Sequence, residues 1–306
     1  MTFKKLMSAA IGTIASILLF SQAQAADKFD TKPRIAVMSA FAPEWQVLLK
    51  DVENPKEYKL HGRSFVTGTL QGKDVVLFLS GVSMVNAAMT TQQAIDYFNI
   101  RAIVFSGIAG GADPSLSIGD VVVSQQWGEY LESIFARETN GSFKIPPFLK
   151  TPFPNFGMIY PNTSQVLTDG MDKPEDRFWF PVDGKLLETA KAVAGSVTLG
   201  KCAGDEKCLN HQPKIIVGGN GVSGPAFIDN AAFRKFAFKT FHAEVLDMES
   251  AATAHVAFVN QVPFIAFRSL SDLAGGGEGE NEMSVFMTLA SSNSARVVKA
   301  FLAKMP

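Results

Sequence analysis

The stretch Glu244–Asp272, EVLDMESAATAHVAFVNQVPFIAFRSLSD, carries the clearest structural signal in the chain. Residues 244–248 and 263–268 are short apolar runs, which predict two strands, and residues 250–260 between them predict a helix. A carboxylate follows each strand, Glu249 after the first and Asp272 after the second. Because open α/β sheets bind ligands at the carboxyl ends of their strands, both acids are candidate site residues.

The same alternation of strand and helix extends over the rest of the chain. A third carboxylate, Glu44, follows the first apolar run, residues 34–40. Three acids at three strand ends predict one shared pocket, and the order of elements predicts the α/β class. Further strands are predicted at 35–40, 64–69, 75–80, 102–106, 120–124 and 215–218, and further helices at 83–98, 186–194, 230–238 and 283–304.

The N-terminal residues have the composition of a secretory signal peptide. Lys4 and Lys5 precede an apolar run from Leu6 to Phe20, and residues 23–25, Ala-Gln-Ala, form a small-x-small cleavage site. A spanning helix needs about 20 apolar residues, and neither this run nor any later segment meets that requirement. We therefore expect a signal peptide at 1–25, a single domain at 26–306, and export to the periplasm or secretion.

Composition narrows the class of partner. The chain has 306 residues, of which 47% are hydrophobic and 19% charged, with a formal net charge of -1. This balance gives no electrostatic reason to expect binding to nucleic acid or to an anionic membrane. A small-molecule partner is the prediction.

The two cysteines bracket a short polar loop. Cys202 and Cys208 are the only cysteines, so in an exported protein they predict a local disulfide. A zinc site is the alternative, but with His211 the chain offers three ligands there and no fourth.

Residues 125–183 break the alternation of strand and helix. This segment is rich in Pro, Phe and Asn, and it reads either as a packed surface excursion, the favoured interpretation, or as a functional lid.

Two glycine-rich runs lie close to predicted strand ends. Residues 106–111, SGIAGG, form either a tight turn or a bare backbone that a ligand can approach, and residues 275–279, GGGEG, predict a flexible turn beside Asp272.

Four collinear segments resemble the nucleoside phosphorylase superfamily. They are DMESAA at 247–252, RSLSD at 268–272, GIAGG at 107–111 and AFAPE at 40–44, and within the superfamily they are most similar to the 5′-methylthioadenosine/S-adenosylhomocysteine nucleosidases. The resemblance implies a single-domain three-layer α/β/α fold with a central mixed sheet. It also implies hydrolysis of the N-glycosidic bond of a purine nucleoside, no metal or organic cofactor, and a homo-oligomer, often a dimer.

The resemblance also assigns residue roles. Asp272, with Ser271 beside it, would protonate the leaving purine, Glu44 would activate water, and Glu249 would bind the ribose hydroxyls, against which Met248 packs. Phe227 would stack on the base. The other positions expected to bind substrate are Val82, Ala109, Gly110, Arg268 and Ile228.

Two positions depart from the nucleosidase pattern and leave alternatives open. Ile108 stands where the nucleosidases have serine, and Pro225 stands where they have aspartate, which puts adenine specificity and the 5′ substituent in doubt. The chain also resembles plant bark or vegetative storage proteins of this fold. The alternatives are therefore a phosphate-dependent phosphorylase, or a nucleoside-binding storage protein with little turnover.

Overall fold

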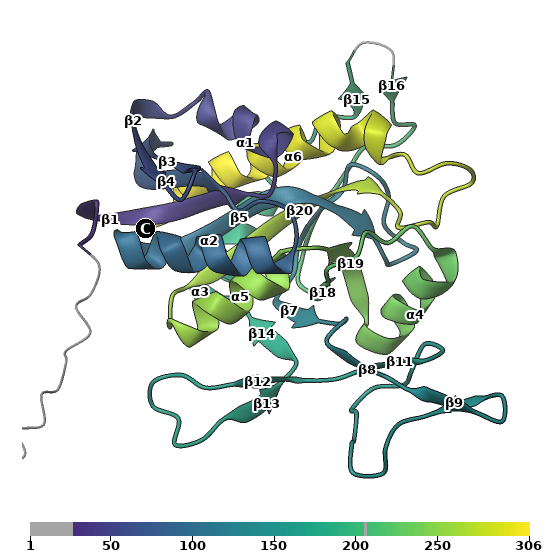
Figure 1. Cartoon of the computed structure of the whole chain (residues 1–306). Helices are drawn as coiled ribbons and strands as arrows, with labels where there is room; N and C mark the ends of the chain where they lie inside the picture. The colour runs from purple at the N-terminus through teal and green to yellow at the C-terminus, as the bar shows by residue number, and fades with distance from the viewer. Residues whose placement is uncertain (1–26, 205–206) are drawn as a thin grey trace, which may run out of the picture.

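A computed structural model of the chain, which describes residues 27–204 and 207–306, is organised around one mixed β-sheet (Figure 1). In spatial order its main path runs through β14 (Trp179–Pro181), β7 (Gln126–Glu129), β18 (Asn220–Ser223), β19 (Ala243–Asp247), β5 (Phe98–Gly111), β1 (Asp30–Ser39), β4 (Lys73–Leu79), β3 (Arg63–Leu70) and β2 (Glu53–Leu60). Off this path, β20 (Phe264–Asp272) pairs with β5 and β6 (Val121–Val123), and β6 also pairs with β17 (Ile215–Val217). Parallel pairs such as β1–β5 and antiparallel pairs such as β19–β5 occur together, so the predicted mixed sheet is confirmed.

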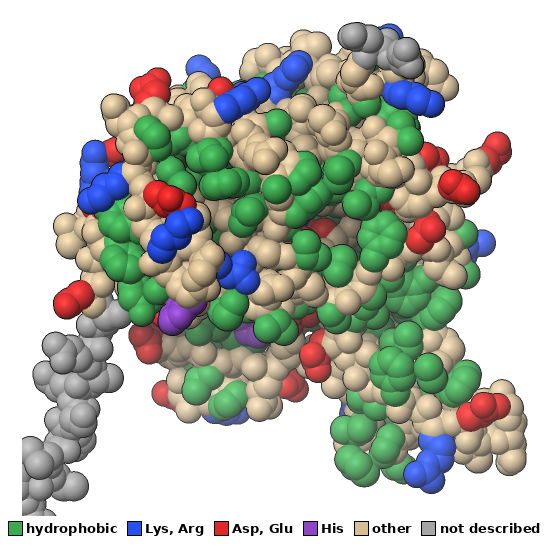
Figure 2. Space-filling model, turned by 45° about the horizontal axis from the view of Figure 1, so that its top comes forward, with side chains coloured by type: hydrophobic (Ala, Val, Ile, Leu, Met, Phe, Trp, Pro, Cys, Tyr) green, Lys and Arg blue, Asp and Glu red, His purple; other side chains and the backbone are tan. Residues whose placement is uncertain are grey.

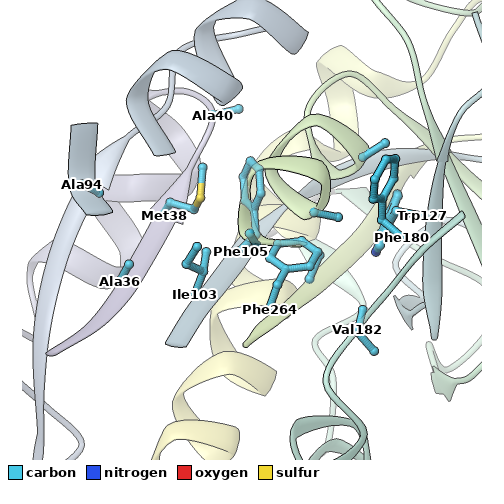
Figure 3. Packing of buried hydrophobic residues seen from close by; sticks show 14 of the residues in the cluster. Ala36, Met38, Ala40, Ala94, Ile103, Phe105, Trp127, Phe180, Val182 and Phe264 are labelled. Atoms are coloured by element: carbon cyan, nitrogen blue, oxygen red, sulfur yellow. The ribbon is translucent and has the colours of Figure 1, made fainter. Parts of the chain in front are cut away.

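Helices cover both faces of the sheet and complete the three layers. Along β1, Ile35 and Val37 join one hydrophobic cluster while Ala36 and Met38 join another, because successive strand side chains point to opposite faces. The first cluster includes buried residues of α1 (Ala42–Leu49), α3 (Gly184–Ala194) and α6 (Met283–Lys304). The second includes residues of α2 (Met84–Tyr97) and α5 (Ser250–Val259), and Figure 3 shows Phe105 and Phe264 packed within it.

The strands and helices predicted from the sequence are present, with one informative difference. The run at residues 106–111 is not a tight turn: β5 continues through it to Gly111 and pairs with β20 and β19. The glycine-rich segment 275–279 lies in the turn region after β20, as predicted. The short helix α1, which holds Glu44, and the strands β2 and β18 had no clear sequence signal.

Segment 125–183 is a surface excursion whose two ends are anchored in the sheet. β7 and β14 at its ends pair with each other, and hairpin-like pairs of short strands lie between them, at the bottom of Figure 1. These are β8 (Ser133–Phe135) with β11 (Ile159–Pro161), β9 (Arg137–Thr139) with β10 (Ser142–Lys144), and β12 (Ser164–Val166) with β13 (Glu175–Arg177). Phe153 and Phe156 pack toward α4 (Ala231–Phe241), while hydrophobic side chains remain visible on the lobe at the lower right of Figure 2.

The predicted disulfide is confirmed. Cys202 and Cys208 are bonded, and they join β15 (Cys202–Ala203) to β16 (Lys207–Cys208). No zinc site is needed to explain the two thiols. The predicted signal peptide lies outside the described residues. Within the described ranges, no helix has both the length and the apolar character needed to cross a membrane.

Candidate active site

One cavity gathers the three acids predicted to share a pocket. It has a volume of about 230 Å³, and Glu44, Glu249 and Asp272 all line it. Glu44 comes from the first turn of α1 just after β1, Glu249 immediately precedes α5 after β19, and Asp272 ends β20. The cavity therefore lies where several strands of the sheet end, as expected for α/β folds.

Glu44 is buried and held by backbone donors. Its Oε2 accepts hydrogen bonds from the N–H groups of Ala40 at 2.7 Å and Phe41 at 3.3 Å, and its Oε1 accepts one from Ile108 at 2.7 Å. Burial raises the pKa of Glu44, while the nearby Arg268 guanidinium and these three N–H groups oppose that rise. The side chain is therefore fixed in orientation while its basicity is increased.

Each carboxylate oxygen of Glu249 faces one N–H donor. Its Oε1 accepts a hydrogen bond from the backbone N–H of Ser83 at 2.8 Å, and its Oε2 lies 3.5 Å from Nη2 of Arg268. Burial raises the pKa of Glu249 to about 7, although the Arg268 charge lowers it; the neighbouring carboxylate of Asp247 raises it further. Ser83 adopts φ 80° and ψ 162°, a backbone conformation that residues other than glycine rarely adopt, and in this conformation its N–H meets the carboxylate.

The structure places Arg268, which was expected to bind substrate, behind the cavity wall. This residue is fully buried and is not among the residues that line the cavity. Its Nε lies 2.7 Å from Oδ2 of Asp247 and donates to Oγ of Ser250 at 2.9 Å, and its guanidinium stacks on the ring of Phe105. Arg268 therefore balances buried carboxylates from behind the cavity wall.

Gly107 makes room for this arrangement. A Cβ at this position would lie 2.1 Å from Nη1 of Arg268 and 2.9 Å from Oε1 of Glu44, closer than non-bonded atoms approach. Only a glycine lets β5 pass between the arginine and the glutamate. The segment 106–111 therefore has two roles. Gly107 leaves room for the buried Arg268 beside Glu44, and Ala109 and Gly110 form part of the cavity wall.

Asp272 is buried, and both of its carboxylate oxygens accept hydrogen bonds. Oδ2 accepts one from the hydroxyl of Ser271 at 2.9 Å, and Oδ1 accepts one from the backbone N–H of Ala274 at 2.8 Å. Burial raises the pKa of Asp272, and these donors only partly oppose it. A carboxyl group in this setting holds a proton at higher pH than an exposed aspartate does.

The remaining wall of the cavity is mainly apolar. All the other expected substrate-binding residues line it, and Phe227, 55% exposed, stands at its mouth. Sequence reasoning missed Met283, which begins α6 and carries no motif, and Phe41, which stands beside Glu44 in the segment 40–44. The other residues that line the cavity are Val82, Ile108, Met248, Ile228, Ser271, Ala40, Ala226, Leu246, Asp247 and Ala274.

Comparisons with known proteins agree with this geometry. The family model described as Phosphorylase superfamily matches residues 34–303. The 5′-methylthioadenosine/S-adenosylhomocysteine nucleosidase of Halalkalibacterium halodurans is 28% identical over 275 residues, covering 89% of this chain and 99% of that protein. Bark storage protein A of Populus deltoides is 28% identical over 257 residues, covering 80% of this chain and 78% of that protein. The Neisseria meningitidis 5′-methylthioadenosine/S-adenosylhomocysteine nucleosidase in complex with methylthio-immucillin-A superposes with a TM-score of 0.65 at 25% identity, covering 89% of this chain and 99% of that one.

Proposed function

Because the chain belongs to the Phosphorylase superfamily, we propose that it hydrolyses the N-glycosidic bond of purine nucleosides and releases free base and sugar. The observation that carries this proposal is the meeting of Glu44, Glu249 and Asp272 in one mainly apolar cavity. Breaking this bond requires a proton for the leaving base, negative charge near the developing sugar cation, and an oriented water molecule. Three carboxylates in three different environments match these three requirements.

Each acid has the surroundings its proposed step needs. Asp272, whose pKa is raised by burial, holds the proton that it gives to the purine, and Ser271 fixes its orientation. Glu249, held by the Ser83 N–H and facing Arg268, accepts hydrogen bonds from the ribose hydroxyls. Glu44 orients and deprotonates the attacking water, in the way that the base of an inverting glycosidase does.

Hydrolysis is favoured over phosphorolysis by the charges around the cavity. None of the described residues that line it is a lysine or an arginine, so a phosphate ion would face three acids without a cation. Arg268 is already engaged with buried carboxylates, and Arg34 is paired with Asp30 and does not line this cavity. Water needs no such counter-charge.

The cavity wall supports a substrate whose 5′ substituent presents an apolar group, such as a thioether, to the wall. Phe41, Val82 and Met283 offer apolar contacts to such a group. Methylthioadenosine-like or adenosylhomocysteine-like nucleosides are therefore proposed, along with other scavenged purine nucleosides. Because Ile108 and Pro225 depart from the nucleosidase pattern, the assay compares purine nucleosides with different bases.

Export and self-association complete the proposal. Cleavage after residue 25 would release residues 26–306 into the periplasm or the medium, a setting in which the disulfide between Cys202 and Cys208 is stable. A homo-oligomer, in the simplest case a dimer, is supported by exposed apolar side chains on α2, where Val85 is 80% exposed and Met89 is exposed as well.

The similarity to bark storage protein A suggests storage or binding of a nucleoside as a second candidate function. A storage or binding protein of this fold would hold a nucleoside in the same cavity without turning it over. The presence of Glu44, Glu249 and Asp272 in one cavity disfavours this second function, because binding alone does not require three carboxylates there.

The test is a phosphate-free assay of purine and pyrimidine nucleosides, with free base measured as product. Base release from purine nucleosides without phosphate supports the proposal, and dependence on phosphate would establish the phosphorylase alternative. Ligand binding without release would identify the storage-type function. Asp272→Asn, which keeps the side-chain shape, is the matched inactive variant, expected to lose about 10²- to 10⁴-fold in kcat.

A further inference from the structure

The N-terminus of α5, which carries Glu249, is held by residues from two neighbouring strands. Glu249 occupies the N-cap position of α5, but its own side chain accepts no hydrogen bond from the first turn. The N–H groups of Glu249 and Ser250 instead donate to Oδ1 of Asp247, both at 3.2 Å. The N–H of Ala251 donates to the hydroxyl oxygen of Ser223 at 2.8 Å. Two other residues therefore satisfy these N–H groups, and the Glu249 carboxylate is left free to face the cavity.

Ser223 is also bonded to Asp247. Its hydroxyl donates to Oδ1 of Asp247 and accepts from the N–H of Ala251, so both the proton and a lone pair of the hydroxyl are engaged. The pairing of β18 with β19 places Ser223 directly beside Asp247 (Figure 1). Ser223 is fully buried and is not among the residues that line the cavity. Its hydroxyl therefore bridges the carboxylate of Asp247 and the first turn of α5 from behind the cavity wall.

Asp247 acts on both the backbone and the carboxylate of Glu249. Its Oδ1 accepts the N–H of Glu249, and its Oδ2 lies 2.7 Å from Nε of Arg268. Nη2 of that arginine lies 3.5 Å from Oε2 of Glu249. A rotation of the Asp247 carboxylate would therefore move Glu249 in two ways. The Ser223 hydroxyl opposes such a rotation, because it is bonded to Oδ1 and is itself anchored by the N–H of Ala251.

We propose that Ser223 is a positioning residue: by bridging Asp247 to the first turn of α5, its hydroxyl keeps the Glu249 carboxylate in place for the ribose hydroxyls. This inference rests on the proposed function, in which Glu249 binds those hydroxyls. Cleavage of a purine ribonucleoside should therefore depend on Ser223 more than cleavage of its 2′,3′-dideoxy analogue, which offers Glu249 no hydroxyl. A serine with a merely structural role would affect both substrates equally.

The test measures kcat/KM of Ser223→Ala with a purine ribonucleoside and with its 2′,3′-dideoxy analogue. For the ribonucleoside, kcat/KM should fall by about 10- to 100-fold, and for the analogue by roughly threefold or less, because only the ribonucleoside uses the misplaced carboxylate. In a Glu249→Gln background the Ser223→Ala change should have little further effect, since the two residues act as one unit. Equal falls for the two substrates, or no fall, would overturn the inference.

Ser269→Ala is the matched control. Ser269 is also fully buried, and its hydroxyl donates to the carbonyl of Gly119 at 3.3 Å. Loss of that bond should lower Tm and leave the ratio of the two kcat/KM values unchanged. Ser223→Cys, whose thiol is a weaker donor, should give a ratio between those of the wild type and Ser223→Ala. If Ser223→Ala does not fold, Ser223→Cys takes its place in the comparison.

A measurement without substrate separates this inference from the proposed function. Oε1 of Glu249 lies 2.8 Å from the backbone nitrogen of Ser83. Crystal structures of the wild-type protein and of Ser223→Ala should show this hydrogen bond in the first and its loss in the second. An unmoved Glu249 carboxylate would overturn the inference. If the wild-type protein releases no base, the proposed function fails, and the position of Glu249 in the two crystal structures alone decides on the role of Ser223.

Discussion

Replacement of Gly107 by alanine should disable the site without any change to an acid. The new Cβ would lie 2.1 Å from Nη1 of Arg268, so the guanidinium must move by about 1.3 Å to reach an ordinary contact distance of about 3.4 Å. The new Cβ cannot shift toward Glu44 instead, because Oε1 of Glu44 lies only 2.9 Å from it. The arginine must therefore give up its contacts with Asp247 or Glu249.

The size of the effect follows from these distances. Overpacking of this kind costs about 1–3 kcal/mol of stability, which lowers Tm by roughly 2–5 °C for a domain of this size. A misplacement of about 1 Å near reacting groups can cost roughly 10²-fold in rate, so kcat/KM should fall by about that factor.

The assay pairs base release with thermal unfolding followed by circular dichroism. Gly184→Ala is the matched control, since a Cβ at Gly184 meets nothing within 4 Å, and it should leave both kcat/KM and Tm near the wild-type values. If Gly107→Ala retains wild-type kcat/KM and Tm, the tight contact among Gly107, Arg268 and Glu44 does not support the site and the reasoning is wrong.

Three further predictions concern single side chains. Glu44→Gln should lower kcat by about 10²- to 10⁴-fold and leave the Kd of a bound nucleoside analogue nearly unchanged, because it removes the base that activates water; a large loss of binding measured by calorimetry would contradict this. Phe227→Ala should weaken nucleoside binding by about 1–3 kcal/mol, the usual worth of stacking on a base, with Tm unchanged because the ring is exposed; unchanged affinity would remove the stacking role. Burial raises the pKa of Glu244 to about 7 from 4.5, so the folded state binds more protons than the unfolded state between these values, and its contribution to stability is lost as pH rises from about 4.5 to about 7. Denaturant unfolding at several pH values should show a shallower decline for Glu244→Gln, and an identical decline would refute the assignment.

The sequence was sufficient for the fold class and for the list of candidate acids. Alternating apolar runs and helical segments predicted the α/β order, because strand and helix periods are local properties of the chain. Glu249 and Asp272 were identifiable because strand ends meet at the ligand crevice of such sheets. The disulfide between Cys202 and Cys208 was equally local, since only two cysteines exist and six positions separate them.

Only the tertiary structure decided which site residues are buried and which distant residues they contact. Arg268 was expected to touch substrate and instead lies behind the wall, where its partners come from β19 and α5. The donor to Glu249 is Ser83, 166 positions away, and the hydroxyl of Ser223 accepts the N–H of Ala251, 28 positions further along. No sequence pattern encodes such contacts, because they depend on how the sheet and its helices pack around the cavity. Each contact is one of many that the same local sequence would permit.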